Sequence, residues 1–317
     1  MLPTSKILGV FNWCLCFLAI SIYVLIFVLA IKAHRSVRDI ALLLTYNTCF
    51  AAFCTCAASA IMIASNLFTG FLVSNMTFCY VWGLFYDICE CSVYFSYCLQ
   101  GFYRLCRVVF YKKKFLVSHY LYIVLIICQW TLVLILLVPP IFIKWYARLS
   151  TEYYCLIPYT YIGPEVYHIL VLYLIPLGCL GTVYVWITTN IRNISRTPNL
   201  AIEAIQRQRN QRDLVVIKRI LFLLSILIVL RFPTVIFMVY GIVVGSLYPL
   251  TYAIVGITTS MCLIVIGFIT IKTTTELEKQ FLSFFTNRNN RVMTGPIPRN
   301  IFNRTNAAAC IRTTSNG

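Results

Sequence analysis

Three charged residues lie at membrane depth within otherwise apolar stretches of this 317-residue sequence: Asp87, Glu90 and Arg231. A charge at membrane depth costs about 2.5 to 3.5 kcal/mol on insertion scales, so such residues usually face a protein interior and pair. Helical periodicity puts Glu90 and Arg104 on one face of one helix, and Asp213 and Arg231 on one face of another. We therefore predict two ion pairs between these helices, Glu90 with Arg231 and Arg104 with Asp213. The alternatives are snorkelling of Arg231 and a solvated loop position for Asp213.

Catalytic and metal-binding patterns are missing from the sequence. Histidine occurs only at positions 34, 119 and 168, and none of the three has metal-ligand spacing. Neither a nucleophile motif nor a phosphate-binding loop is present. We therefore expect neither an enzyme nor a bound cofactor or metal.

The elements that must position the charged residues are seven apolar stretches joined by short polar segments. Hydrophobic residues make up 61% of the chain and charged residues 11%, which leaves no soluble domain of ordinary composition. Each stretch is long enough to cross a bilayer, and in lipid it must close its own backbone hydrogen bonds as a helix. The predicted fold is therefore all-α, a bundle of seven transmembrane helices. The stretches cover residues 7–31, 40–64, 78–105, 119–143, 166–190, 215–242 and 248–271.

The flanking segments complete the predicted organisation. Residues 1–6 form an N-terminal arm, and residues 7–271 form the bundle. Within residues 272–286, Leu277, Phe281 and Phe285 recur at helical spacing beside charged residues, which predicts a short amphipathic helix lying in the membrane interface. Residues 287–317 are polar and contain two prolines, so we expect a disordered tail.

The basic residues predict how the bundle is oriented. They cluster in the joints after the first, third and fifth stretches, whereas the other side of the membrane carries only Lys6, Lys144 and Arg148. The positive-inside rule then predicts a multi-pass plasma membrane protein with an extracellular N-terminus and a cytoplasmic C-terminus. The formal charge of +17 sits at membrane edges without interleaved aromatic residues. This pattern favours membrane lipids and a cytoplasmic protein as partners and no nucleic acid.

Two of the fifteen cysteines lie beside extracellular joints, Cys79 and Cys155. Because that compartment is oxidising, we predict that they form a disulfide, with two free thiols as the alternative. The other cysteines lie mostly in apolar helices, where a thiol packs as a small hydrophobic group. The sequon at Asn75 lies on the same side and is a predicted glycosylation site.

Several spacings resemble those of the rhodopsin-like (class A) G-protein-coupled receptors. The matching residues are Cys79 and Arg104 in the third stretch, Trp130 in the fourth, Pro176 and Tyr184 in the fifth, and Pro233 in the sixth. The departures mark a divergent member, because Tyr103 replaces the acid that usually precedes the arginine. Arg231 also stands where the family has its switch tryptophan, and the usual Asn-Pro-x-x-Tyr motif is missing from the seventh stretch.

The resemblance implies a receptor that transmits extracellular ligand binding to a cytoplasmic heterotrimeric G protein. It places the ligand pocket at the outer ends of the helices, lined by Tyr86, Asp87, Glu90, His168, Arg231, Thr234 and Met238. It assigns activation and G-protein coupling to Arg104, Tyr184, Asp213 and Pro233. The tyrosine-rich loop around Cys155 favours a peptide ligand over a small molecule if it folds as a hairpin. A seven-span transporter or channel is the alternative function.

Overall fold

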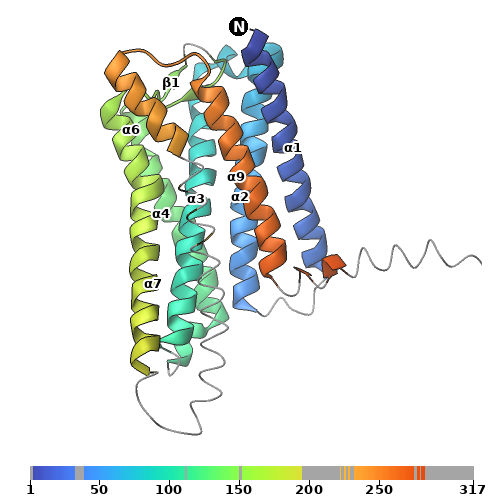
Figure 1. The fold of residues 1–317 in the computed structure, drawn as a ribbon, viewed down its shortest axis with the longest axis vertical. Coiled ribbons are helices and arrows are strands. Elements are labelled where there is room, and N and C mark those ends of the chain that lie inside the picture. Colours follow the sequence, from blue (N-terminus) through green and yellow to red (C-terminus); the bar gives the residue numbers. More distant parts are fainter. Residues whose placement is uncertain are drawn as a thin grey trace, which may run out of the picture.

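The computed structural model describes residues 3–32, 39–110, 113–149, 152–194, 222, 225, 228, 232–274, 277, 278 and 280–282. Long helices stand side by side as one bundle, and a small hairpin lies at the end where the N-terminus is found (Figure 1). The first half of the chain contains α1 (Pro3–Lys32), α2 (Ile40–Ala64), η2 (Ser65–Thr69), η3 (Phe71–Ser74), α3 (Met76–Val108), η4 (Lys114–Val117) and α4 (His119–Leu137). The second half contains α5 (Pro139–Phe142), β1 (Ala147–Arg148), β2 (Cys155–Leu156), α6 (Ile162–Ile169), η5 (Leu170–Leu174), α7 (Ile175–Ile194), a helix over Phe232–Val244, and α9 (Thr251–Thr273).

The helices confirm the predicted all-α bundle of membrane-spanning elements. Within the described residues, five helices are long and apolar enough to cross a bilayer: Thr4–Ile31, Ile40–Phe68, His119–Phe142, Ile162–Asn190 and Thr251–Lys272. The helix Phe232–Val244 is a shorter apolar segment of the predicted sixth span. α3 is 33 residues long and more polar, because it carries Asp87 and Glu90. Each of the seven predicted spans therefore contains helix among the described residues, although the sixth is described only at 222, 225 and 228 and from Phe232 onward.

Several helices extend beyond their predicted ends. α1 begins at Pro3, so residues 3–6 of the expected N-terminal arm are helical. α3 begins at Met76 because the side chain of Asn75 accepts a hydrogen bond from the backbone N–H of Phe78 at 3.2 Å and caps the helix. The fifth span begins at Ile162, four residues earlier than predicted, and continues through the π-helical turn η5 into α7. This extension brings Glu165 into the bundle.

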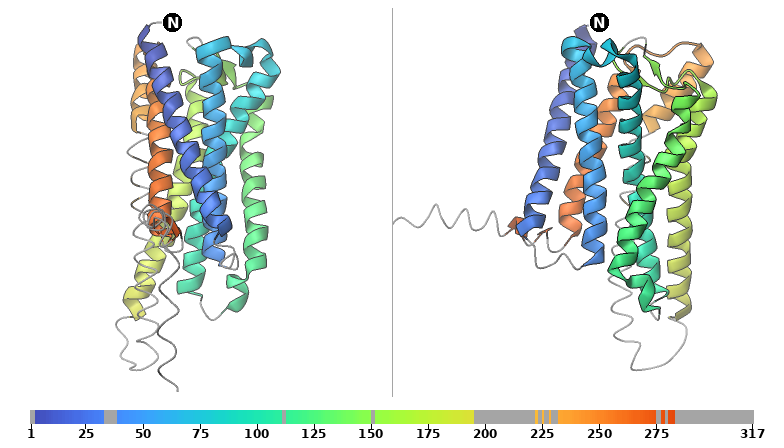
Figure 2. Two further views of the ribbon diagram at one scale, coloured as in Figure 1. Left: turned by 90° about the vertical axis from the view of Figure 1, so that its right-hand side faces the viewer. Right: turned by 180° about the vertical axis from the view of Figure 1, so that it is seen from behind.

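α3 lies at the centre of the bundle and packs against α2, α4 and α7 (Figure 2). Buried amides join three of these helices: the Asn47 amide donates to Gln129 Oε1 at 2.8 Å, and Trp130 Nε1 donates to Asn47 Oδ1 at 3.0 Å. The Gln129 amide also donates to the Ser92 carbonyl of α3 at 3.1 Å. Because lipid cannot satisfy polar groups, such bonds hold membrane helices together.

α1 and α9 approach each other closely on the opposite side of α2. The Tyr23 hydroxyl donates to the Leu263 carbonyl at 2.8 Å, and the Ser260 hydroxyl donates to Asn12 Oδ1 at 2.7 Å. Gly267 permits this packing, because a Cβ there would lie 2.7 Å from Ile22 Cγ2. Beyond α9, residues 277, 278 and 280–282 are helical, and Leu277 is fully buried against the core.

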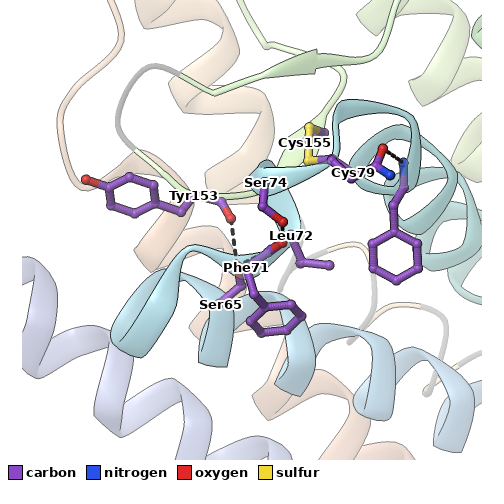
Figure 3. The surroundings of a disulfide bond; sticks show 9 residues. Ser65, Phe71, Leu72, Ser74, Cys79, Tyr153 and Cys155 are labelled. Atoms are coloured by element: carbon purple, nitrogen blue, oxygen red, sulfur yellow. Dashed lines mark hydrogen bonds between the residues drawn. A yellow bond between two sulfur atoms is a disulfide. The ribbon is translucent and has the colours of Figure 1, made fainter.

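The segment between α5 and α6 folds as the predicted hairpin over the N-terminal end of the bundle. β1 and β2 pair antiparallel, with Arg148 opposite Cys155. The predicted disulfide between Cys79 and Cys155 is confirmed and fixes β2 to the start of α3 (Figure 3). Beside it, the Ser65 hydroxyl donates to the Tyr153 carbonyl at 3.0 Å. The hairpin is therefore held to both α3 and η2.

Gly83 allows β2 to lie directly on α3, because a Cβ at this position would collide with the carbonyl oxygen of Cys155. We expect Gly83→Ala to weaken docking of the hairpin by about 1 to 3 kcal/mol, the usual cost of overpacking. Faster hydrogen exchange in the hairpin would report this loss. Gly178→Ala on α7 is the matched control, since its added Cβ meets no atom within 4 Å. Equal exchange rates in the two variants would contradict the prediction.

Candidate functional site

A cavity opens beneath the hairpin and contains about 950 Å³ of empty space, including its open mouth. Five of the seven predicted ligand residues line it: Tyr86, Asp87, Glu90, His168 and Thr234. Met238, four residues beyond Thr234, is a described residue that does not line the cavity. Arg231 lies outside the described residues. The cavity also contains acids and tyrosines that sequence reasoning did not assign to it.

Asp87 connects α3 with the hairpin and with α6. The residue is 1% exposed, and its Oδ2 atom accepts a hydrogen bond from the Tyr146 hydroxyl at 2.6 Å. Burial, and secondarily Asp87, raises the pKa of Tyr146 well above its ordinary value, so this phenol remains a donor. His168 Nε2 lies 3.5 Å from the same carboxyl oxygen. Asp87 therefore holds the hairpin to the wall of the cavity.

Glu165 is a site residue that sequence reasoning missed. It lies one turn before His168 on α6, and its Oε2 atom is 4.0 Å from His168 Nδ1. The whole residue is only 1% exposed. The three-residue spacing from His168 is a helical pairing signal that could have identified it, had the fifth span been extended to include it.

Glu90 forms the floor of the cavity. It accepts a hydrogen bond from the Tyr173 hydroxyl at 3.3 Å and is 5% exposed. Glu90 also lines a second pocket between α2, α3 and α9, which contains about 250 Å³ of empty space including its open mouth. Its predicted partner, Arg231, falls outside the described residues, so the ion pair stays a prediction.

Glu152 is a second acid that sequence reasoning missed. It belongs to the hairpin, yet it is only 4% exposed, lines the cavity and accepts a hydrogen bond from the Asn66 amide. Burial raises the pKa of Glu152 to about 7, although the Asn66 hydrogen bond acts in the opposite direction. No sequence signal separates this residue from an ordinary solvated loop acid.

The raised pKa of Glu152 predicts that docking of the hairpin depends on pH. The docked hairpin keeps a proton that a free hairpin releases near the ordinary pKa of 4.5. Docking should therefore weaken as the pH rises from about 4.5 to about 7, by at most about 3 kcal/mol in total. Hydrogen exchange of the hairpin, corrected for intrinsic rates, measures this change. Glu152→Gln should remove the pH dependence, and an unchanged slope in that variant would contradict the assignment.

The opposite end of the bundle contains two of the residues predicted to couple to a G protein. The Arg104 guanidinium lies 5.7 Å from the centre of the Tyr103 ring. Tyr184 of α7 packs against a buried cluster of Leu105, Val108 and Ile187. α3 and α7 therefore meet at this end.

The remaining predicted residues lie in different parts of the chain. Pro233 lies in the helical segment Phe232–Val244, and residues 222, 225 and 228 before it are also helical. Asp213 lies outside the described residues, so its pairing with Arg104 stays a prediction. Asn75 is exposed at the start of α3, where a glycan could be attached. Its glycosylation also stays a prediction.

Comparisons with known proteins identify the fold. No protein-family model matches the sequence, and no curated protein matches it. Among solved structures, the crystal structure of squid rhodopsin is similar, with a TM-score of 0.69 and 14% sequence identity over 92% of this chain and 88% of that chain. At this low identity the similarity shows the fold alone. The chain has the fold of squid rhodopsin, which is the fold of the rhodopsin-like G-protein-coupled receptors that its motifs resemble.

Proposed function

We propose that this protein is a G-protein-coupled receptor of the plasma membrane, with its N-terminus outside the cell. It would transmit binding of an extracellular ligand in the outer cavity to a heterotrimeric G protein. The observation that carries this proposal is a rhodopsin-like fold with a cavity under a disulfide-anchored hairpin at one end of α3 and Arg104 at the other. Glu90 and Arg104 are about 21 Å apart along that helix at 1.5 Å per residue.

The hairpin favours a peptide ligand. Tyr154 and Tyr159 line the cavity, while Tyr153 and Tyr161 are exposed above it. Tyrosines offer large, rigid and amphipathic contact surfaces to a peptide. A small molecule that fills the cavity alone is the other ligand class.

The proposed transmission uses α3 and the sixth helix. Glu90 and Arg231 would form a pair at the cavity floor, and Arg104 and Asp213 would form a lock at the cytoplasmic end. Ligand binding would move the sixth helix outward, open the lower pair and leave the upper pair as a hinge. Basic residues at the cytoplasmic joints would then face an acidic surface of the G protein as well as lipid head groups.

Ligand-dependent nucleotide exchange tests the proposal. Cells expressing the protein would be exposed to peptide and small-molecule libraries, and exchange would be measured on a panel of G proteins. A ligand that accelerates exchange only in expressing cells supports the receptor function. Solute flux without any exchange would instead indicate the transporter or channel and overturn the proposal.

A further inference from the structure

We propose that the outer cavity binds an organic cation, an amine or guanidinium group of the ligand, between carboxyl groups and tyrosine rings. This inference deepens the proposed receptor function and rests on it for the identity of the ligand site. The bound group could belong to a small amine or to a basic residue of a peptide.

Four buried carboxyl groups line the cavity, and they come from separate parts of the fold. Asp87 and Glu90 lie on α3, Glu152 lies in the hairpin, and Glu165 lies on α6. Each is at most 5% exposed. Acids placed so deeply lose hydration, so each is costly unless it is protonated or a cation compensates for it.

The partners of these acids are mostly neutral. Tyrosine hydroxyls donate to Asp87 and Glu90, and the Asn66 amide donates to Glu152. Among the described residues that line the cavity there is no lysine or arginine, and His168 is the single side chain that can become a cation. Because Arg231 is the partner predicted for Glu90, the inference rests on the other three acids. One imidazole cannot balance all three.

Three buried polar atoms in the cavity wall have no hydrogen-bond partner: Oε2 of Glu165, Oγ1 of Thr234 and Nε2 of His168. The nitrogen faces Asp87 at 3.5 Å, whereas the two oxygens belong to residues that are only 1% and 6% exposed. A buried polar atom left without a partner costs about 1 to 3 kcal/mol. Both oxygens can accept a hydrogen bond from an ammonium or guanidinium N–H. A bound cation would thus donate hydrogen bonds to two oxygens that accept none from the described residues.

Tyrosine rings supply the rest of the predicted site. The five that line the cavity are Tyr86, Tyr154, Tyr159, Tyr173 and Tyr252. The rings of Tyr159 and Tyr252 are stacked, with centroids 5.0 Å apart. Aromatic faces attract organic cations through the ring quadrupole. The described residues include no cluster of three or more histidine, cysteine or acidic residues that could hold a metal ion, which favours an organic cation over a metal.

A first experiment measures the charge of the cavity without any ligand. Thr234→Cys places a thiol in the cavity wall, and its labelling would be compared for cationic and anionic methanethiosulfonate reagents of similar size. The unsubstituted protein gives the background from its own cysteines. Ser246→Cys, at an exposed position between the sixth helix and α9, is the control thiol. We expect the cationic reagent to react at least tenfold faster at position 234 relative to position 246.

Removing acids should reduce this preference in a defined way. Glu165→Gln and Glu152→Gln, each added to Thr234→Cys, should lower the ratio of cationic to anionic labelling severalfold. Glu278→Gln, which lies beyond α9, should leave the ratio unchanged. An equal labelling rate for the two reagents at position 234 would overturn the inference. So would a ratio of cationic to anionic labelling that stays unchanged in both Glu165→Gln and Glu152→Gln.

A second experiment identifies the source of the cation. The thermal unfolding temperature of the purified full-length protein in nanodiscs would be measured with increasing concentrations of each probe. The probes are spermidine, phenethylamine, an arginine-rich peptide and uncharged analogues of each. Thermal stabilisation by a cationic probe, with an affinity that falls at least tenfold in Glu165→Gln, supports the site. The probe that binds with the highest affinity then distinguishes a small amine from a peptide. Stabilisation by the uncharged analogues alone would overturn the inference. Cation binding without nucleotide exchange would keep the site and refute only the receptor function.

Discussion

Replacing Glu90 with arginine should abolish ligand-dependent nucleotide exchange and sharply reduce the amount of protein at the cell surface. Glu90 is buried at the floor of the cavity, where it accepts a hydrogen bond from the Tyr173 hydroxyl. An arginine there would face Arg231 of the predicted pair. Breaking a buried pair in this way costs about 3 to 5 kcal/mol, because it leaves charges without compensation. Surface labelling and nucleotide exchange in the same cells measure the two losses.

The double exchange Glu90→Arg with Arg231→Glu separates a pair from two independent sites. It restores opposite charges, so we expect partial recovery of surface expression and exchange. Glu165→Arg with Arg231→Glu is the matched control and should not recover, because Glu165 lies on α6 at the wall of the cavity. Failure of the first double variant to exceed either single variant would exclude the pairing of Glu90 with Arg231.

The membrane helices were predictable because lipid leaves a long apolar segment few alternatives. The predicted second span, residues 40–64, coincides with α2, which begins after its Asp39 cap. The ends of α3 were less predictable, since its first turn depends on the Asn75 cap and not on hydropathy. The pairing of Cys79 with Cys155 followed from the oxidising compartment that both residues are predicted to face.

Glu152 and Glu165, the two cavity acids outside α3, could not be predicted from hydropathy, because their burial depends on tertiary structure. Glu152 is a loop residue until the disulfide places the hairpin beside Asn66. Glu165 stands before the predicted fifth span and becomes a wall residue only because α6 begins at Ile162. The Asn47–Gln129 bond likewise joins two helices whose relative rotation no apolar pattern specifies. Hydropathy therefore predicts the helices better than it predicts what they enclose.

Replacing Cys155 with serine should weaken ligand binding by at least 100-fold while leaving the helical bundle folded. The disulfide links positions 76 residues apart, and loss of a native disulfide typically costs about 2 to 5 kcal/mol. This cost should fall mainly on the hairpin, because β2 is fixed to α3 through Cys155. Undocking would withdraw Tyr146 from Asp87 and Glu152 from the cavity wall. Ligand titration and hydrogen exchange of the hairpin measure both effects.

The control for this variant is Cys179→Ser, which removes an exposed free thiol of α7 and should change neither measurement. Cys79→Ser should match Cys155→Ser, because either substitution breaks the same bond. The double variant should be no worse than the single ones, since no second interaction is lost. Normal ligand affinity in Cys155→Ser, together with faster exchange of the hairpin, would show that the cavity binds its ligand without the hairpin. The wall formed by Tyr154 and Glu152 would then have no part in recognition, and the acids of α3 and α6 would have to account for it alone.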